Sequence, residues 1–154
     1  MTDKREFRMI NGNNEADHRV VRLLIARQFR SLSWNAICAP DWDRFSADFL
    51  PGAQLFPAAR PVRPVSVPDF VTRMKTAAAS TMPVFEETLL GVEIGPYGKV
   101  AVALAVCEQR EQDAPPERAV EALLLLKEDG IWRIAAQGWD KEDDGAPIPK
   151  ALFD

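Results

Sequence analysis

The stretch LLLLKEDGIWRIAAQGWDKE, residues 123–142, decides the fold class. Its centre, Glu128-Asp129-Gly130, is a strong hairpin signal, because Asp and Gly tolerate the left-handed backbone conformations of tight β-turns. Segments rich in aliphatic and aromatic residues lie on both sides of this turn. We therefore predict two antiparallel strands, residues 118–127 and 131–140.

The last predicted strand carries two tryptophans, Trp132 and Trp139, seven positions apart. Side chains alternate between the faces of a sheet, so an odd spacing places them on opposite faces. We expect Trp132 to face the helices, and Gln137 to share the outer face with Trp139 unless a β-bulge changes the register. Trp139 would then contact a second subunit, or else the C-terminal tail, residues 146–154.

Two more strands are predicted upstream, at residues 84–95 and 99–110, on either side of a Gly-Pro-Tyr-Gly turn. In the second of them, KVAVALAVCEQR, large aliphatic residues alternate with alanines. This period of two is typical of a strand with two different faces. The second half of the chain therefore predicts four strands joined by hairpins or short loops.

The first half reads as helical. Apolar residues recur at helical spacing through residues 15–38, behind a possible N-cap at Asn14. A second helix is expected to begin at Asp41 and to end at Pro51-Gly52. A third is expected to begin at Ser66, where Ser, Pro and Asp form a capping sequence, and to end before Pro83.

The segment AQLFPAARPVRPVSVP, residues 53–68, separates the second helix from the third. Residues 53–56 are predicted to form a short strand. The prolines that follow lack backbone donors, which excludes a central strand and favours an extended path along an edge or the surface. This path is either a connector or the lip of a pocket, with Arg60 and Arg63 as contacts for an anion.

Helices followed by antiparallel strands indicate an α+β fold with the helices on one face of the sheet. This order resembles the nuclear transport factor 2-like (SnoaL-like) superfamily, and within it the bacterial members of unassigned function. The hairpin at 123–142 resembles the terminal hairpin of that group, and VFEETLLGVEIGPYGKVAVALAV, residues 84–106, its central hairpin. The resemblance covers residues 14–142, with residues 1–13 as a polar leader and 143–154 as a tail.

The resemblance implies a cystatin-like, cone-shaped roll, in which three N-terminal helices pack on a curved, mostly antiparallel sheet and enclose a pocket. Enzymes of the superfamily place a carboxylate in that pocket. The isomerase-type acid would fall at Phe56-Pro57, where none is present, and the late strand is apolar around residues 122–126. The dehydratase type uses histidines, and this chain has only His18.

One acid remains as a candidate. Glu87 stands between Phe85 and Leu89 on one face of a predicted strand, so alternation would carry it into an apolar interior. Burial raises the pKa of a carboxyl group and makes it a useful acid or base near neutral pH. We predict Glu87 as the catalytic residue, with Arg60 or Arg63 as its partner; the alternative is a strand-end glutamate in a surface ion pair.

The expected function is the binding of a small apolar or anionic molecule in the cone. One alternative is a non-catalytic dimerisation or interaction module whose cone is filled by its own side chains; another is a small lyase, isomerase or hydrolase that uses the buried carboxylate. The predicted ligand-binding residues are Trp34, Phe45, Phe49, Phe56, Arg63, Phe70 and Met74.

We also expect a homodimer. An outer sheet face made of alanines and a tryptophan would be flat and apolar, which suits contact with a second copy of the chain. The residues predicted to form it are Ala101, Ala103, Ala105, Gln137 and Trp139.

Composition argues against several other classes. The net charge is −4 and no basic cluster is present, which disfavours nucleic-acid binding. No apolar run is long enough for a membrane span and no secretory signal is apparent, so a cytoplasmic location is expected. Cys38 and Cys107 form no metal-binding motif, so no metal and no cofactor is predicted. Two buried thiols are favoured for them, and a disulfide is left open.

Overall fold

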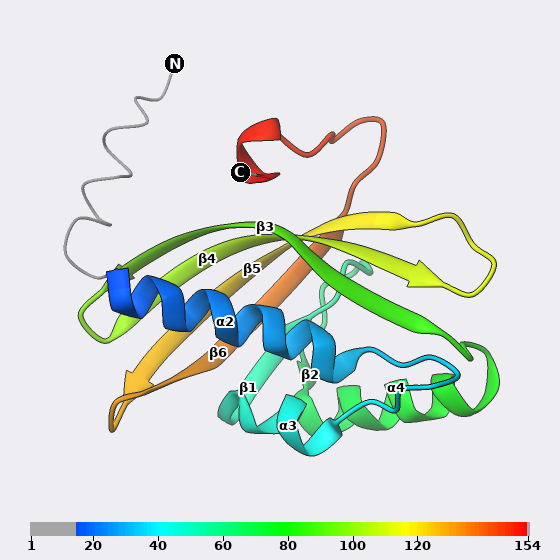
Figure 1. Ribbon diagram of the computed structural model, residues 1–154, viewed down its shortest axis with the longest axis horizontal. Helices are drawn as coiled ribbons and strands as arrows, with labels where there is room; N and C mark the ends of the chain where they lie inside the picture. The colour runs from blue at the N-terminus through cyan, green and yellow to red at the C-terminus, as the bar shows by residue number, and fades with distance from the viewer. Residues whose placement is uncertain (1–14, 154) are drawn as a thin grey trace.

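The computed structural model describes residues 15–153 (Figure 1). The predicted leader and the expected cap at Asn14 lie outside these residues. The helices are α2 (Glu15–Leu32), α3 (Trp42–Ala47) and α4 (Val67–Ser80), with a short C-terminal 3₁₀ helix η1 (Lys150–Phe153). The strands are β1 (Phe49–Phe56), β2 (Val65–Ser66), β3 (Phe85–Tyr97), β4 (Val100–Glu111), β5 (Glu117–Glu128) and β6 (Ile131–Lys141).

The six strands form one curved sheet in the order β2-β1-β6-β5-β4-β3. Strands β3 to β6 are consecutive antiparallel neighbours, and β2 is antiparallel to β1. Among the strands of residues 15–153, only the β1–β6 pair is parallel. Helix α2 crosses one face of the sheet, with α3 and α4 beyond its end (Figure 1). The predicted α+β roll with three helices on a mostly antiparallel sheet is confirmed.

Two expected helix ends are wrong. Helix α2 ends at Leu32 rather than residue 38, because Trp34 leaves the helix to form an antiparallel bridge with Phe85. The Trp34 indole N–H also donates to the Met82 carbonyl oxygen at 2.8 Å. Helix α3 ends at Ala47, and Pro51-Gly52 lies inside β1, where a register shift between Phe49 and Gln54 accommodates the missing proline donor.

The predicted caps at two helix starts are present. The Asp41 carboxylate accepts a hydrogen bond from the backbone N–H of Arg44 at 3.0 Å. The Ser66 hydroxyl accepts one from the backbone N–H of Asp69 at 3.1 Å. Each cap satisfies a backbone donor that the first turn of a helix leaves unpaired.

A β-bulge in β6 decides which side chains face the helices. Ile134 pairs with Leu125 and Ala136 with Leu124, so Ala135 is an extra residue. Beyond the bulge Gln137 is buried. Trp139 packs against Phe70 of α4, with ring centres 6.0 Å apart. The expectation that Gln137 and Trp139 lie on the outer face is therefore wrong, because the bulge returns both to the inner face.

The alanines of β4 also face inward. Ala101, Ala103 and Ala105 are buried in the same apolar cluster as Val21 and Ile25 of α2. Their small side chains leave room for α2 to lie against the sheet. The predicted self-association surface is thus wrong in all five residues, since every one of them lies on the inner face.

The C-terminal helix η1 covers part of the opposite, outer face. Leu152 and Phe153 lie directly against the backbone of Gly91 in β3, and the Arg118 guanidinium lies 5.4 Å from the centre of the Phe153 ring. This cover accounts for Val106, which is fully buried although Val102 and Leu104 on the same face of β4 are exposed. None of the helices between residues 15 and 153 is long and apolar enough to span a lipid bilayer.

Candidate functional site

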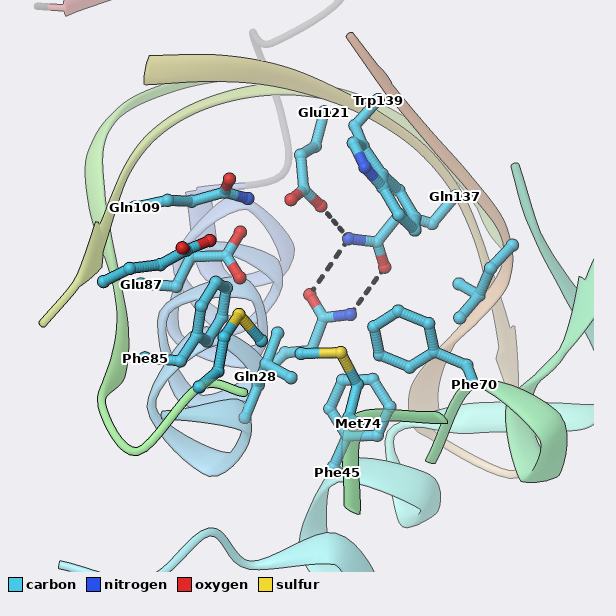
Figure 2. Close-up of a pocket in the computed structure, with 14 residues that line it drawn as sticks. Gln28, Phe45, Phe70, Met74, Phe85, Glu87, Gln109, Glu121, Gln137 and Trp139 are labelled. Carbon is cyan, nitrogen blue, oxygen red and sulfur yellow. Dashed lines mark hydrogen bonds between the residues drawn. The ribbon is translucent and has the colours of Figure 1, made fainter. Parts of the chain in front are cut away.

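A cavity of about 200 Å³ lies between the helices and the inner face of the sheet. Aromatic and methionine side chains form one part of its wall, and glutamate and glutamine side chains form the other (Figure 2). The apolar lining includes Phe45, Phe70, Met74, Met82, Phe85 and Trp139. The polar lining consists of Gln28, Glu87, Gln109, Glu111, Glu121 and Gln137.

Glu87 reaches the cavity from β3, as alternation with Phe85 predicts. Ser33, just after α2, fixes the backbone at this point, because the Glu87 N–H donates to the Ser33 hydroxyl at 2.9 Å. The Glu87 side chain is only 4 % exposed. Its Oε1 atom is buried and has no hydrogen-bond partner within the described chain. A buried carboxylate oxygen without a donor is costly and marks a position where a ligand could donate.

Glu121 faces Glu87 from β5 (Figure 2). The Gln137 amide donates a hydrogen bond to its Oε2 atom, and the Cys107 thiol lies 3.8 Å from its Oε1 atom. Burial, followed by the negative charge of Glu87, raises the pKa of Glu121 well above its ordinary value. Glu121 therefore holds a proton at pH values where an exposed glutamate would be ionised.

Glu121 is not among the residues that the sequence singles out. The apolar character expected for residues 122–126 is correct, and the acid lies one position earlier. Alternation with Leu123 and Leu125, both buried, could have located it, since it shares their face of β5.

Two glutamines connect Glu121 to α2. Gln28 donates to the Gln137 side-chain oxygen at 2.5 Å, and Gln137 donates to the Gln28 oxygen at 3.3 Å. Both amides are buried. Because Gln137 also donates to Glu121, its amide orientation is fixed from two sides. Nothing in the sequence pattern indicates this pair, because Gln28 lies on a helix and the bulge changes the face of Gln137.

The two cysteines are free and lie in different surroundings. Cys38 is exposed, so the expectation of two buried thiols is wrong for it, while Cys107 is buried beside the carboxyl pair. Burial and then the charge of Glu87 raise the pKa of the Cys107 thiol. Ligand-type atoms of Glu87, Cys107 and Glu121 all lie within 4.8 Å of one another. The thiol remains protonated in this setting, which makes it a hydrogen-bond donor rather than a nucleophile.

The residues predicted to bind a ligand separate into two groups. Phe45, Phe70 and Met74 line the cavity. Trp34 and Phe49 are buried in the surrounding core, and Phe56 lies against Gly138 beside a groove on the outer face of the sheet. Arg63 lines a separate surface depression together with Arg60. Neither arginine is a partner of Glu87, because the proline-rich segment carries both away from the cone.

Comparison with known proteins gives structural matches only. No protein-family model matches the chain, and no curated protein is similar to it in sequence. A cystatin-like protein of unknown function from Nostoc punctiforme has a TM-score of 0.66 and 14% identity, over 86% of this chain and 96% of that one. A nuclear transport factor 2-like protein of unknown function from Pseudomonas putida has a TM-score of 0.65 and 13% identity, over 90% and 92%.

A third similar structure is an enzyme. A hexachlorocyclohexane dehydrochlorinase from Novosphingobium barchaimii has a TM-score of 0.62 and 9% identity, over 87% of this chain and 94% of that one. Identities this low carry the fold and not the chemistry. The chain has the cystatin-like fold of the nuclear transport factor 2-like proteins, as the order of its helices and strands predicts.

Proposed function

We propose that this chain binds a small molecule in the cone-shaped cavity, with Glu87 as the group that makes the polar contact. The main support is the buried Oε1 atom of Glu87, which borders the cavity and has no donor among the described residues. The Gln28–Gln137 pair and Glu121 are already hydrogen bonded to each other. The Oε1 atom of Glu87 is thus a buried polar atom of the cavity wall that still needs a partner.

The proposal is tested by ligand-observed NMR with a library of small neutral, anionic and cationic compounds. Met74→Trp should block binding, because Met74 lines the cavity from α4. Lys75→Trp is the matched control, since Lys75 is exposed and does not line the cavity. Compounds that bind both variants equally well would place the binding elsewhere and contradict the proposal.

Proton transfer within a bound molecule is a second candidate function. It is favoured by two carboxyl groups that approach within 4.8 Å while the raised pKa keeps one of them protonated. Such a pair offers a base and an acid at the same site. This reading covers the lyase, isomerase and hydrolase alternatives, and the dehydrochlorinase shares the fold.

Deuterium exchange tests this second function without a known substrate. Small ketones are incubated with the protein in D₂O, and incorporation beside the carbonyl is followed by NMR. Glu87→Gln should abolish exchange, and Glu86→Gln should leave it intact, since Glu86 is bound by Asn35 outside the cavity. Equal rates with both variants would exclude Glu87 as the base.

We also propose a homodimer, on a surface different from the one the sequence suggests. The outer face of β4 and β5 carries partly exposed aliphatic side chains, here called the outer apolar face: Val100, Val102, Leu104, Leu124 and Leu126. A groove runs along it between Phe56 and Glu93. Helix η1 leaves this part of the sheet uncovered, and a second copy would bury apolar area that is otherwise in water. A dimer and a ligand-binding cavity are compatible, since they use opposite faces.

A further inference from the structure

We propose that the cavity takes a small organic monocation, a primary or secondary ammonium compound, whose N–H groups bind Glu87 while its hydrocarbon part lies against the aromatic wall. The inference rests on the proposed function of the cavity in ligand binding. It adds the charge class of the ligand, and it reverses the anionic class that Arg63 suggests from the sequence.

The charge of the lining favours a cation. Three glutamates and three glutamines line the cavity, and among the described lining residues there is no Lys, Arg or His. The ion pairs found between residues 15 and 153 do not involve Glu87 or Glu121. An anionic ligand would therefore meet carboxyl groups without a compensating positive charge, whereas a cation would supply the missing one.

A hydrogen bond between Glu121 and Glu87 joins the carboxyl pair, and the Oε1 atom of Glu87 remains without a donor. Gln137 donates a hydrogen bond to Oε2 of Glu121, and the Cys107 thiol donates one to Oε1. The Oε1 atom of Glu87 has no partner, although this residue is only 4 % exposed. What this atom needs is a donor, and an ammonium group offers N–H donors together with a positive charge.

The close approach of the two carboxyl groups favours a ligand with a single positive charge. Burial, and then the charge of Glu87 within 4.8 Å, raise the pKa of Glu121, so the pair favours one negative charge over two. A divalent metal ion would have to displace the protons of both Glu121 and Cys107, which the same surroundings hold in place. A monocation matches the pair without any proton leaving.

The remaining wall suits the carbon skeleton of an amine. Phe85 lies two positions before Glu87 on the same face of β3, and Phe45 stacks on Phe70 with ring centres 5.7 Å apart. Trp139 adds a fourth ring. Aromatic faces attract a nearby cation. A volume of about 200 Å³ limits the ligand to a single ring or a short chain.

Three probes of nearly equal shape separate the charge classes: benzylamine, benzyl alcohol and benzoate, each titrated calorimetrically at neutral pH. Benzylamine is protonated under these conditions. It should bind at least about tenfold more tightly than benzyl alcohol, because a hydrogen bond to a buried charge is stronger than a neutral one. Benzoate should not bind.

Two variants identify the partner of the ammonium group. Glu87→Gln should lower the affinity for benzylamine about tenfold and leave that for benzyl alcohol nearly unchanged. Glu86→Gln is the control, since it removes a neighbouring acid that Asn35 binds outside the cavity. Thermal unfolding of both variants establishes that they are folded.

The outcomes separate this inference from the proposed function. Tighter binding of benzyl alcohol or benzoate than of benzylamine would overturn the cation assignment and leave the ligand cavity standing. Zn²⁺ binding that Cys107→Ser abolishes would overturn it in favour of a metal site. Failure of all three probes to bind would overturn the cation assignment, whereas the proposed function fails if no compound of the NMR library binds.

Discussion

At the scale of single residues, the cone contains two acids, Glu87 and Glu121, of which only Glu87 is predicted from the sequence. Glu87 could be predicted, because alternation with Phe85 carries it inward wherever the strand packs against helices. Glu121 obeys the same rule among Leu123 and Leu125, but a glutamate in a leucine-rich strand stands out only once its face is known. Gln28 could not be found in this way, since its role depends on Gln137 from a distant segment.

The raised pKa of Glu121 predicts a pH dependence of stability. The folded protein holds a proton that the unfolded chain releases near pH 4.5. The contribution of Glu121 to stability is therefore complete below that value and falls as pH rises toward the folded pKa, by up to about 1.4 kcal/mol per pH unit. Glu121→Gln should remove this slope. Denaturant unfolding between about pH 5 and about pH 8 measures it, and Glu86→Gln should retain the slope of the unaltered protein.

Asp48 is a second buried acid, with a structural role. It is 3 % exposed and pairs with Arg27 at 2.5 Å and Arg44 at 3.1 Å. Asp48→Ala would leave both guanidinium groups without their partner, and the loss should be about 1.5 kcal/mol, since the carboxylate is buried but both arginines stay partly exposed to water. Denaturant unfolding checks this value. A loss below about 0.5 kcal/mol would mean that the pair behaves as an exposed one.

At the scale of elements, helix and strand types follow from local patterns, while their ends depend on distant contacts. The caps at Asp41 and Ser66 fix the starts of two helices from within a few residues. The end of α2 depends instead on Phe85, whose backbone pairs with Trp34 across a long sequence separation. The helical periodicity of the sequence continues past Leu32, because a local pattern carries no information about a bridge to a later strand.

Attachment of η1 to the sheet predicts a sensitive glycine. A Cβ atom at Gly91 would overlap the Leu152 carbonyl oxygen and lie 2.7 Å from the Phe153 Cα. Gly91→Ala should therefore displace η1, expose Val106 and cost about 1–2 kcal/mol. Faster removal of the last residues by carboxypeptidase would reveal the displacement. Phe153→Ala should have a similar effect, and an unchanged digestion rate in both variants would contradict the contact.

At the scale of the whole molecule, the two faces of the sheet have different surroundings. The inner face holds the cavity and the acid pair, and the outer apolar face remains partly exposed. The roll itself could be predicted from element order, because helices followed by antiparallel hairpins have few ways to pack. The assignment of residues to the two faces of the sheet could not be predicted, since a single bulge at Ala135 reverses it for the second half of β6.

The outer apolar face predicts a self-association that a charge should prevent. Leu104→Glu would place a carboxylate in the centre of the proposed contact and should convert the dimer to a monomer in sedimentation or light-scattering measurements. Val62→Glu is the matched control, because Val62 is exposed on the proline-rich segment, outside this face. A monomeric unaltered protein, or a dimer that survives Leu104→Glu, would contradict the proposal.

The extra residue at Ala135 also determines which kinds of sequence change the chain could survive. Removing that one alanine would rotate everything after it by half a turn, so that Trp139 points to solvent and Gly138 points to the cone. The side-chain amide of Gln137, which donates a hydrogen bond to Glu121, would also turn away from the cone. Deletion of Ala135 should therefore disrupt the interior more completely than substitution of any one of its neighbours.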